Sequence, residues 1–116
     1  MSQCCMHEVE YWGNFPVVQI PCVISFSMKE EEWCITVEDV ESRELAFYVD
    51  RKIVAVDVAP ILESAGPHIP TVMPGQGIVK CKLWDYPDED TARVEIPGEP
   101  WSFGPRFIVP RSAIVV

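Results

Sequence analysis

Hydrophobic and polar residues alternate most regularly between Val18 and Met28. Successive side chains of a strand point to opposite faces, so a period of two predicts a strand with one apolar face. The apolar face carries Val18, Ile20, Cys22, Ile24, Phe26 and Met28, and the other face carries Gln19, Pro21, Ser25 and Ser27. We expect Ile20, Ile24 and Phe26 to lie in the core. Pro21 cannot donate a ladder hydrogen bond and indicates an edge position or a bulge.

Further short apolar runs, separated by polar or glycine-containing turns, follow along the chain. Runs of this length bounded by turn residues are typical of strands, and their short spacing indicates an antiparallel meander. The further strands predicted are residues 5–12, 33–38, 45–49, 53–58, 78–84, 91–96, 107–109 and 113–116. One short helix is predicted near residues 58–65, through Pro60–Ser64, with a cap at or just after Asp57 and Gly66 as its stop.

Eleven prolines among 116 residues interrupt the long apolar runs of the chain. Because proline breaks helix interiors, such a chain is not built from long helices. Valine and isoleucine are plentiful while leucine is scarce, which favours strands. The sequence therefore predicts an all-β protein of one domain, residues 1–116, with roughly six to eight short antiparallel strands in a partly open barrel or a sandwich.

The formal net charge of −9 limits the classes of partner. Binding to nucleic acid or to an anionic membrane needs lysine and arginine, so we expect neither partner. No apolar run approaches the length of a membrane-spanning helix, and no basic region followed by an apolar stretch marks a secretory signal at the start. Five cysteines, an odd count without a Cys-x-x-Cys pair, predict reduced thiols in a cytoplasmic protein, with Cys22, Cys34 and Cys81 inside strands.

Aromatic and acidic residues gather in and beside the loops that follow residue 83. Exposed aromatic side chains among charges are enriched at interfaces, because they offer a large contact area at low entropic cost. The alternative is that these rings close one end of a barrel. The candidate binding residues are Trp84, Asp85, Tyr86, Asp88, Glu89, Asp90, Trp101 and Phe103.

Part of the C-terminal third resembles Src-homology-3 domains. Leu83–Tyr86, followed by Asp88–Asp90, is similar to the aromatic signature and acidic loop of that family. Residues 107–115 are similar to its closing strand, proline turn and last strand, and Trp101 lies roughly where a ligand-stacking tryptophan is found. The resemblance implies a small barrel and binding of a peptide by this third. Ala113 stands where the family usually has a tyrosine after the proline turn.

Motifs for catalysis are absent from the sequence. There is no Gly-x-Ser-x-Gly elbow, phosphate loop or dinucleotide fingerprint. Cys4, Cys5 and His7 lack the second ligand pair of a zinc site, and the acids of residues 85–90 lack the spacing of a calcium loop. We therefore expect no enzyme activity, no metal and no cofactor.

The expected function is non-catalytic binding of a protein partner. The acidic charge favours a basic partner, and the protein is then an inhibitor of the immunity type or an accessory protein. The alternative is a small-molecule or small hydrolytic site lined by Trp84, Trp101 and His68. We also expect a homodimer, because the apolar segment 113–116 would leave a poorly protected strand edge.

Overall fold

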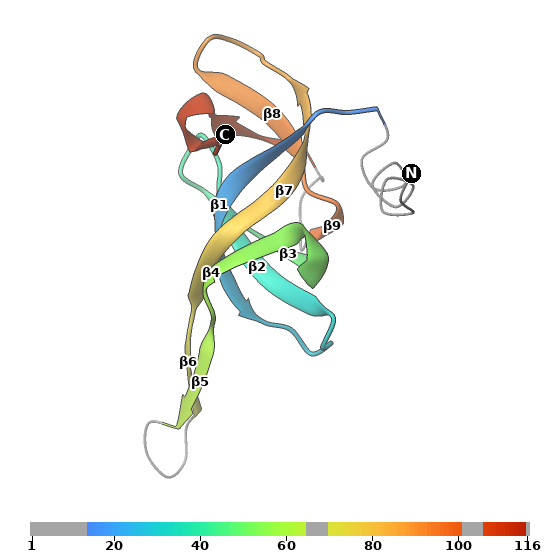
Figure 1. Ribbon diagram of the computed structural model, residues 1–116. Helices are drawn as coiled ribbons and strands as arrows, with labels where there is room; N and C mark the ends of the chain where they lie inside the picture. Colours follow the sequence, from blue (N-terminus) through green and yellow to red (C-terminus); the bar gives the residue numbers. More distant parts are fainter. Residues whose placement is uncertain (1–13, 65–69, 101–105, 116) are drawn as a thin grey trace.

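The computed structural model describes residues 14–64, 70–100 and 106–115, and Figure 1 shows their arrangement. These residues form antiparallel strands and two short 3₁₀ turns. The elements are β1 (Val17–Phe26), β2 (Glu32–Glu38), β3 (Glu44–Asp50), η1 (Arg51–Ile53), β4 (Val54–Val58), β5 (Ile61–Ser64), β6 (Pro70–Met73), β7 (Gly75–Asp85), β8 (Thr91–Glu95), β9 (Gly98–Pro100), β10 (Arg106–Pro110) and η2 (Arg111–Ala113). The predicted strand at residues 5–12 lies outside the described residues. Within the described part, no helix is long and apolar enough to cross a membrane.

The long strand β7 organises the main sheet, whose order is β10-β8-β7-β1-β2-β3-β9. One edge of β7 pairs with β1, while its other edge pairs first with β4 and then with β8. The sheet curls because of the twist of its strands, and the backbone N–H of Val40 donates to the carbonyl of Ile108 at 2.8 Å. The result is a half-barrel, which confirms the predicted all-β class and the partly open barrel.

The inner face of β1 carries the alternation that predicted this strand. Ile20 and Ile24 are buried in the core, as expected, together with Cys22. The prediction for Phe26 is wrong, because its side chain is 42% exposed. Phe26 points to the same side as Ile24, but it lies at the end of β1, where it packs against Trp33 with ring centroids 6.0 Å apart. The alternation therefore predicts correctly which face of β1 is buried, but it does not predict where the core ends.

The short helix predicted near residues 58–65 is wrong. Residues Ile61–Ser64 form strand β5, which pairs with β6 from Ile61↔Met73 to Ser64↔Pro70. Pairing with a distant segment here overrides a weak local preference for helix. The resulting β5–β6 hairpin adds two strands that the sequence pattern did not predict.

The C-terminal segment is also different from the expected strand at residues 113–116. Arg111–Ala113 form the turn η2, and Val115 then makes an isolated bridge with Gln19, its N–H donating to the Gln19 carbonyl at 2.8 Å. Pro110 precedes the turn and cannot continue the ladder as a donor. The segment thus covers part of the outer edge of β1.

Two glycines allow β4 and β7 to approach closely at the base of the β5–β6 hairpin. A Cβ atom on Gly75 would collide with the carbonyl oxygen of Val58, and one on Gly77 would collide with that of Ala55. It would also lie 2.9 Å from Cδ1 of Ile24. Backbone contact of this kind admits only glycine, so these two residues determine where the hairpin leaves the half-barrel.

Candidate functional site

The aromatic and acidic residues predicted as a binding site lie at the surface, at the end of β7 and in the turn to β8. Trp84 is 36% exposed and Tyr86 is 47% exposed, so these two rings do not close the barrel. Asp85, Asp88, Glu89 and Asp90 are exposed beside them. The remaining two predicted residues, Trp101 and Phe103, lie outside the described residues.

Arginines from later in the chain cover both described rings. The guanidinium of Arg111 lies 3.8 Å from the centre of the Tyr86 ring, and that of Arg106 lies 4.3 Å from the centre of the Trp84 ring. Each of these cation–π contacts occupies one face of its ring, so that face is not free to stack on a ligand. Trp84 also donates its indole N–H to Oε1 of Glu95 at 3.1 Å.

The acidic residues of this turn are partly neutralised from within the protein. Arg93 forms an ion pair with Asp85 at 2.9 Å. Oδ1 of Asp88 accepts hydrogen bonds from the backbone N–H of Asp90 at 2.8 Å and from the Thr91 hydroxyl at 3.0 Å, and these bonds lower the pKa of Asp88. The carboxylate of Asp88 therefore shapes the turn and stays charged, while Arg93 offsets the charge of Asp85.

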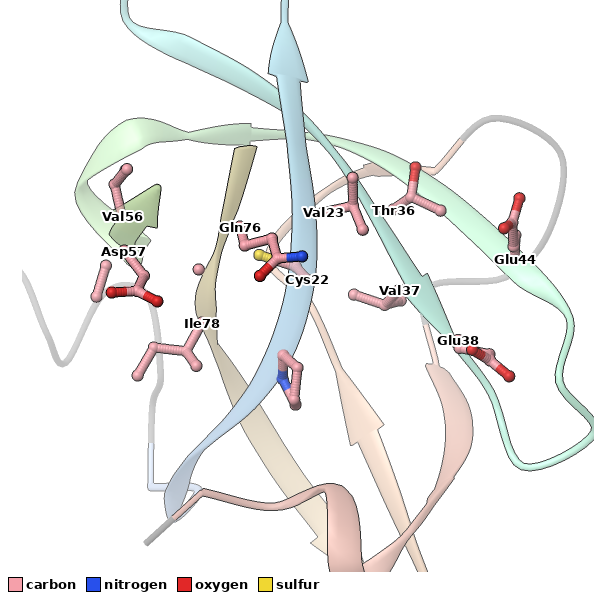
Figure 2. Close-up of a pocket in the computed structure, with 13 residues that line it drawn as sticks. Cys22, Val23, Thr36, Val37, Glu38, Glu44, Val56, Asp57, Gln76 and Ile78 are labelled. Carbon is pink, nitrogen blue, oxygen red and sulfur yellow. The ribbon is translucent and has the colours of Figure 1, made fainter. Parts of the chain in front are cut away.

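A second surface feature, which we call the groove, is a cavity of about 690 Å³ on the opposite part of the sheet (Figure 2). Four strands and the start of a fifth contribute to it. The β1–β2, β2–β3, β1–β7 and β4–β7 ladders hold them in place. Its lining residues are Pro21, Cys22, Val23, Thr36, Val37, Glu38, Glu44, Ala55, Val56, Asp57, Gln76, Gly77 and Ile78.

The middle of the groove is apolar. Val23 and Val56 are each more than 40% exposed, although both belong to strands of the main sheet. Figure 2 shows Val56 and Ile78 on one side and Val23 and Val37 on the other, with Gln76 between them. Exposed apolar side chains that line one hollow are typical of a binding surface, whereas scattered ones are not.

Three carboxylates lie around this apolar surface. Asp57 belongs to the β4 side, while Glu38 and Glu44 face each other across the β2–β3 ladder. None of the thirteen lining residues is lysine, arginine or histidine. Among the described residues, none of the three carboxylates forms an ion pair, so their negative charges add. Two like charges directly opposite each other in a sheet also reduce its stability.

The sequence alone did not indicate the groove. Its residues come from separate strands, and apart from the buried Cys22 and Val37 they have the pattern of ordinary outer-face positions. One signal was present: Val23 is an apolar residue on the face of β1 that otherwise carries Gln19, Pro21 and Ser25. Such an exception on a polar face indicates an exposed apolar site.

The three cysteine thiols of the described residues are unreactive at neutral pH. Cys22 and Cys81 are buried, as predicted, and Cys34 is half-buried. Burial raises the pKa of Cys22 to about 12 and also raises the pKa of Cys81. For Cys34, burial and the nearby Glu32 raise the pKa in the same direction. Because the thiolate is the nucleophile, none of these three groups is activated at neutral pH.

Other candidate sites of the sequence fall mostly outside the described residues, including His68 and the Cys4, Cys5 and His7 group. Within the described part, no group of three or more histidine, cysteine, aspartate or glutamate side chains is arranged to hold a metal ion. No protein-family model, curated protein or solved structure matches this chain.

Proposed function

We propose that this protein is a non-catalytic binding module whose groove holds a basic and apolar segment of a partner protein. The observation that carries the proposal is the lining of the groove, in which Glu38, Glu44 and Asp57 surround the exposed side chains of Val23 and Val56 without any basic residue. A lysine- or arginine-bearing segment with apolar neighbours matches both parts of this surface.

Electrostatics favour the same partner over a neutral one. The chain has a formal net charge of −9, and complementary charge accelerates association with a basic protein. A cation placed between Glu38 and Glu44 would also relieve the repulsion between these cross-strand neighbours. An inhibitor or accessory protein for a basic enzyme is the more specific form of this proposal.

The size of the groove fits a short stretch of chain. Its volume of about 690 Å³ lies within the roughly 300–1,000 Å³ found for binding clefts. The predicted aromatic site fits a ligand less well, because arginines already cover Trp84 and Tyr86.

The proposal is tested with a short synthetic peptide of alternating lysine and valine, titrated by isothermal calorimetry. The variant is the triple substitution Glu38→Gln, Glu44→Gln and Asp57→Asn. Exposed ion pairs contribute about 0.2–1 kcal/mol each, so loss of three of them is expected to weaken binding about tenfold.

The matched control is the triple substitution Glu30→Gln, Glu31→Gln and Glu89→Gln. These three side chains are exposed elsewhere on the surface, and the control changes the net charge by the same amount. We expect it to alter affinity far less than the groove variant does. Equal weakening by both triples would mean that only the overall charge acts, and no weakening by the groove triple would exclude the groove.

A further inference from the structure

Strands β5 and β6 extend from the half-barrel as a two-stranded ribbon, continuous with the ends of β4 and β7 (Figure 1). The ladder from Val54↔Val79 to Val58↔Gln76 is followed by the separate ladder of β5 with β6. In the described part of the chain, β5 and β6 pair only with each other. We call residues 58–64 and 70–76 the arm.

The arm exposes aliphatic side chains along its length. Register places Ile61 opposite Met73 on one face and Leu62 opposite Val72 on the other face. The exposed fractions lie between 41% and 61% for Val58, Ile61, Leu62, Val72 and Met73. A two-stranded hairpin is marginally stable in water without a third strand or a packed face. Both faces of the arm therefore favour a covering partner.

We propose that the arm is a self-association element that clasps the arm of a second copy of this chain. The charge distribution of the chain supports this assignment. Between residues 58–64 and 70–76 the sequence has one charged residue, Glu63, whereas each chain has a net charge of −9. Two copies therefore meet at the arm with little repulsion between carboxylates. A basic partner, by contrast, gains nothing from electrostatic steering at this uncharged surface.

The apolar area of the arm also matches the area that a dimer needs. A large aliphatic side chain removes on the order of 120 Å² from water when fully buried, so five half-exposed ones present about 300 Å² on each arm. Two arms present about 600 Å² of apolar surface, which corresponds to an interface of about 1,000 Å² at the usual apolar share of roughly 60%. That value reaches the lower limit for a specific interface.

The apolar area of the arm also indicates how the two copies meet. A flat surface would cover either the Ile61–Met73 face or the Leu62–Val72 face, and the buried area would then fall to about half of that limit. Both faces are covered when each arm lies between the arm and the half-barrel of its partner. Such a two-fold arrangement uses the same patch on both copies and closes the assembly at a dimer.

Sedimentation velocity from low to high micromolar concentration tests this proposal. The arm variant combines Ile61→Lys with Leu62→Lys. The control combines Met28→Lys with Val40→Lys, two exposed positions on turns of the half-barrel, and it adds the same charge. We expect the wild type and the control to reach twice the 13.1 kDa mass of one chain and the arm variant to remain at that single mass.

Two further measurements distinguish loss of the dimer from loss of the fold and from loss of peptide binding. The milder substitution Leu62→Ser, together with near-ultraviolet circular dichroism, separates loss of the dimer from loss of the fold. The alternating lysine and valine peptide should still bind the arm variant, because Ile61 and Leu62 are not among the residues that line the groove. A wild type that stays at single mass, or an arm variant that still dimerises, would overturn the proposal. Loss of peptide binding in the arm variant would instead assign the arm to the partner of the groove.

Discussion

Replacement of Phe47 by alanine is expected to lower the free energy of unfolding by about 3–5 kcal/mol. Phe47 lies on β3 with its side chain fully buried, opposite Ile35 in the β2–β3 ladder. Its ring centre lies 5.6 Å from that of Phe107 on β10, so it links β3 to the β8–β10 side of the half-barrel. The lost contacts and the cavity left behind both contribute to this value. Urea denaturation followed by tryptophan fluorescence measures it.

The matched control is the same substitution at Phe26. This side chain is 42% exposed at the end of β1, so Phe26→Ala is expected to cost about 1–2 kcal/mol. Two equal losses, or a larger loss at Phe26, would contradict the position of the core described above.

The second large effect is expected at Asp39, which is 5% exposed at the β2–β3 turn. Its Oδ1 accepts hydrogen bonds from the backbone N–H groups of Glu41 and Arg43, each at 2.9 Å, and its Oδ2 accepts one from Nε of Arg43 at 2.8 Å. The turn also holds Ser42 at a φ of 63°, in the left-handed region. Asp39→Ala leaves two backbone donors without this acceptor and is expected to cost about 2–3 kcal/mol.

The contribution of Asp39 should depend on pH. Burial raises the pKa of this carboxyl, but the hydrogen bonds and the charge of Arg43 outweigh burial, and the pKa lies below the ordinary value of 3.8. Because the folded protein binds the proton more weakly than the unfolded chain, this stabilisation is complete above 3.8 and is lost as the pH falls through the lowered pKa. Denaturation of the wild type and Asp39→Asn should therefore show a difference at neutral pH that shrinks in acid.

Asp88→Ala provides the control for Asp39. Asp88 makes a similar turn with Asp90 and Thr91, but it is exposed, so its replacement should reduce stability less than Asp39→Ala does. An equal loss at the two positions, or a difference between wild type and Asp39→Asn that grows in acid, would contradict the assignment of Asp39.

The strands could be predicted wherever the pattern of a single segment determines the structure. The alternation from Val18 to Ile24 reports which side of β1 is buried, because period two follows from the geometry of the strand itself. The helix predicted at Pro60–Ser64 is wrong because the structure of this segment depends on pairing with residues 70–73, which no local pattern indicates. The prediction that Phe26 lies in the core is wrong for a related reason, because the neighbouring strands determine where the core ends.

The candidate site shows the same limit more strongly. Trp84, Asp85 and Tyr86 are consecutive in the sequence and lie together at the surface of the structure. The arginines that cover the two rings come from residues 106 and 111, so their effect required the fold. The groove depends on four strands and on two glutamates that meet only in the β2–β3 ladder. Its charge and its apolar surface therefore emerge from topology, not from any motif.

Binding of a basic and apolar segment in the groove can be observed residue by residue by nuclear magnetic resonance. Amide signals of isotope-labelled protein are followed while the alternating lysine and valine peptide is added. We expect the amides of Val23, Val56 and Ile78 to shift together and to saturate, while the Trp84 indole and Tyr86 amide signals stay in place. Shifts confined to Trp84 and Tyr86, with the groove signals unchanged, would contradict binding in the groove.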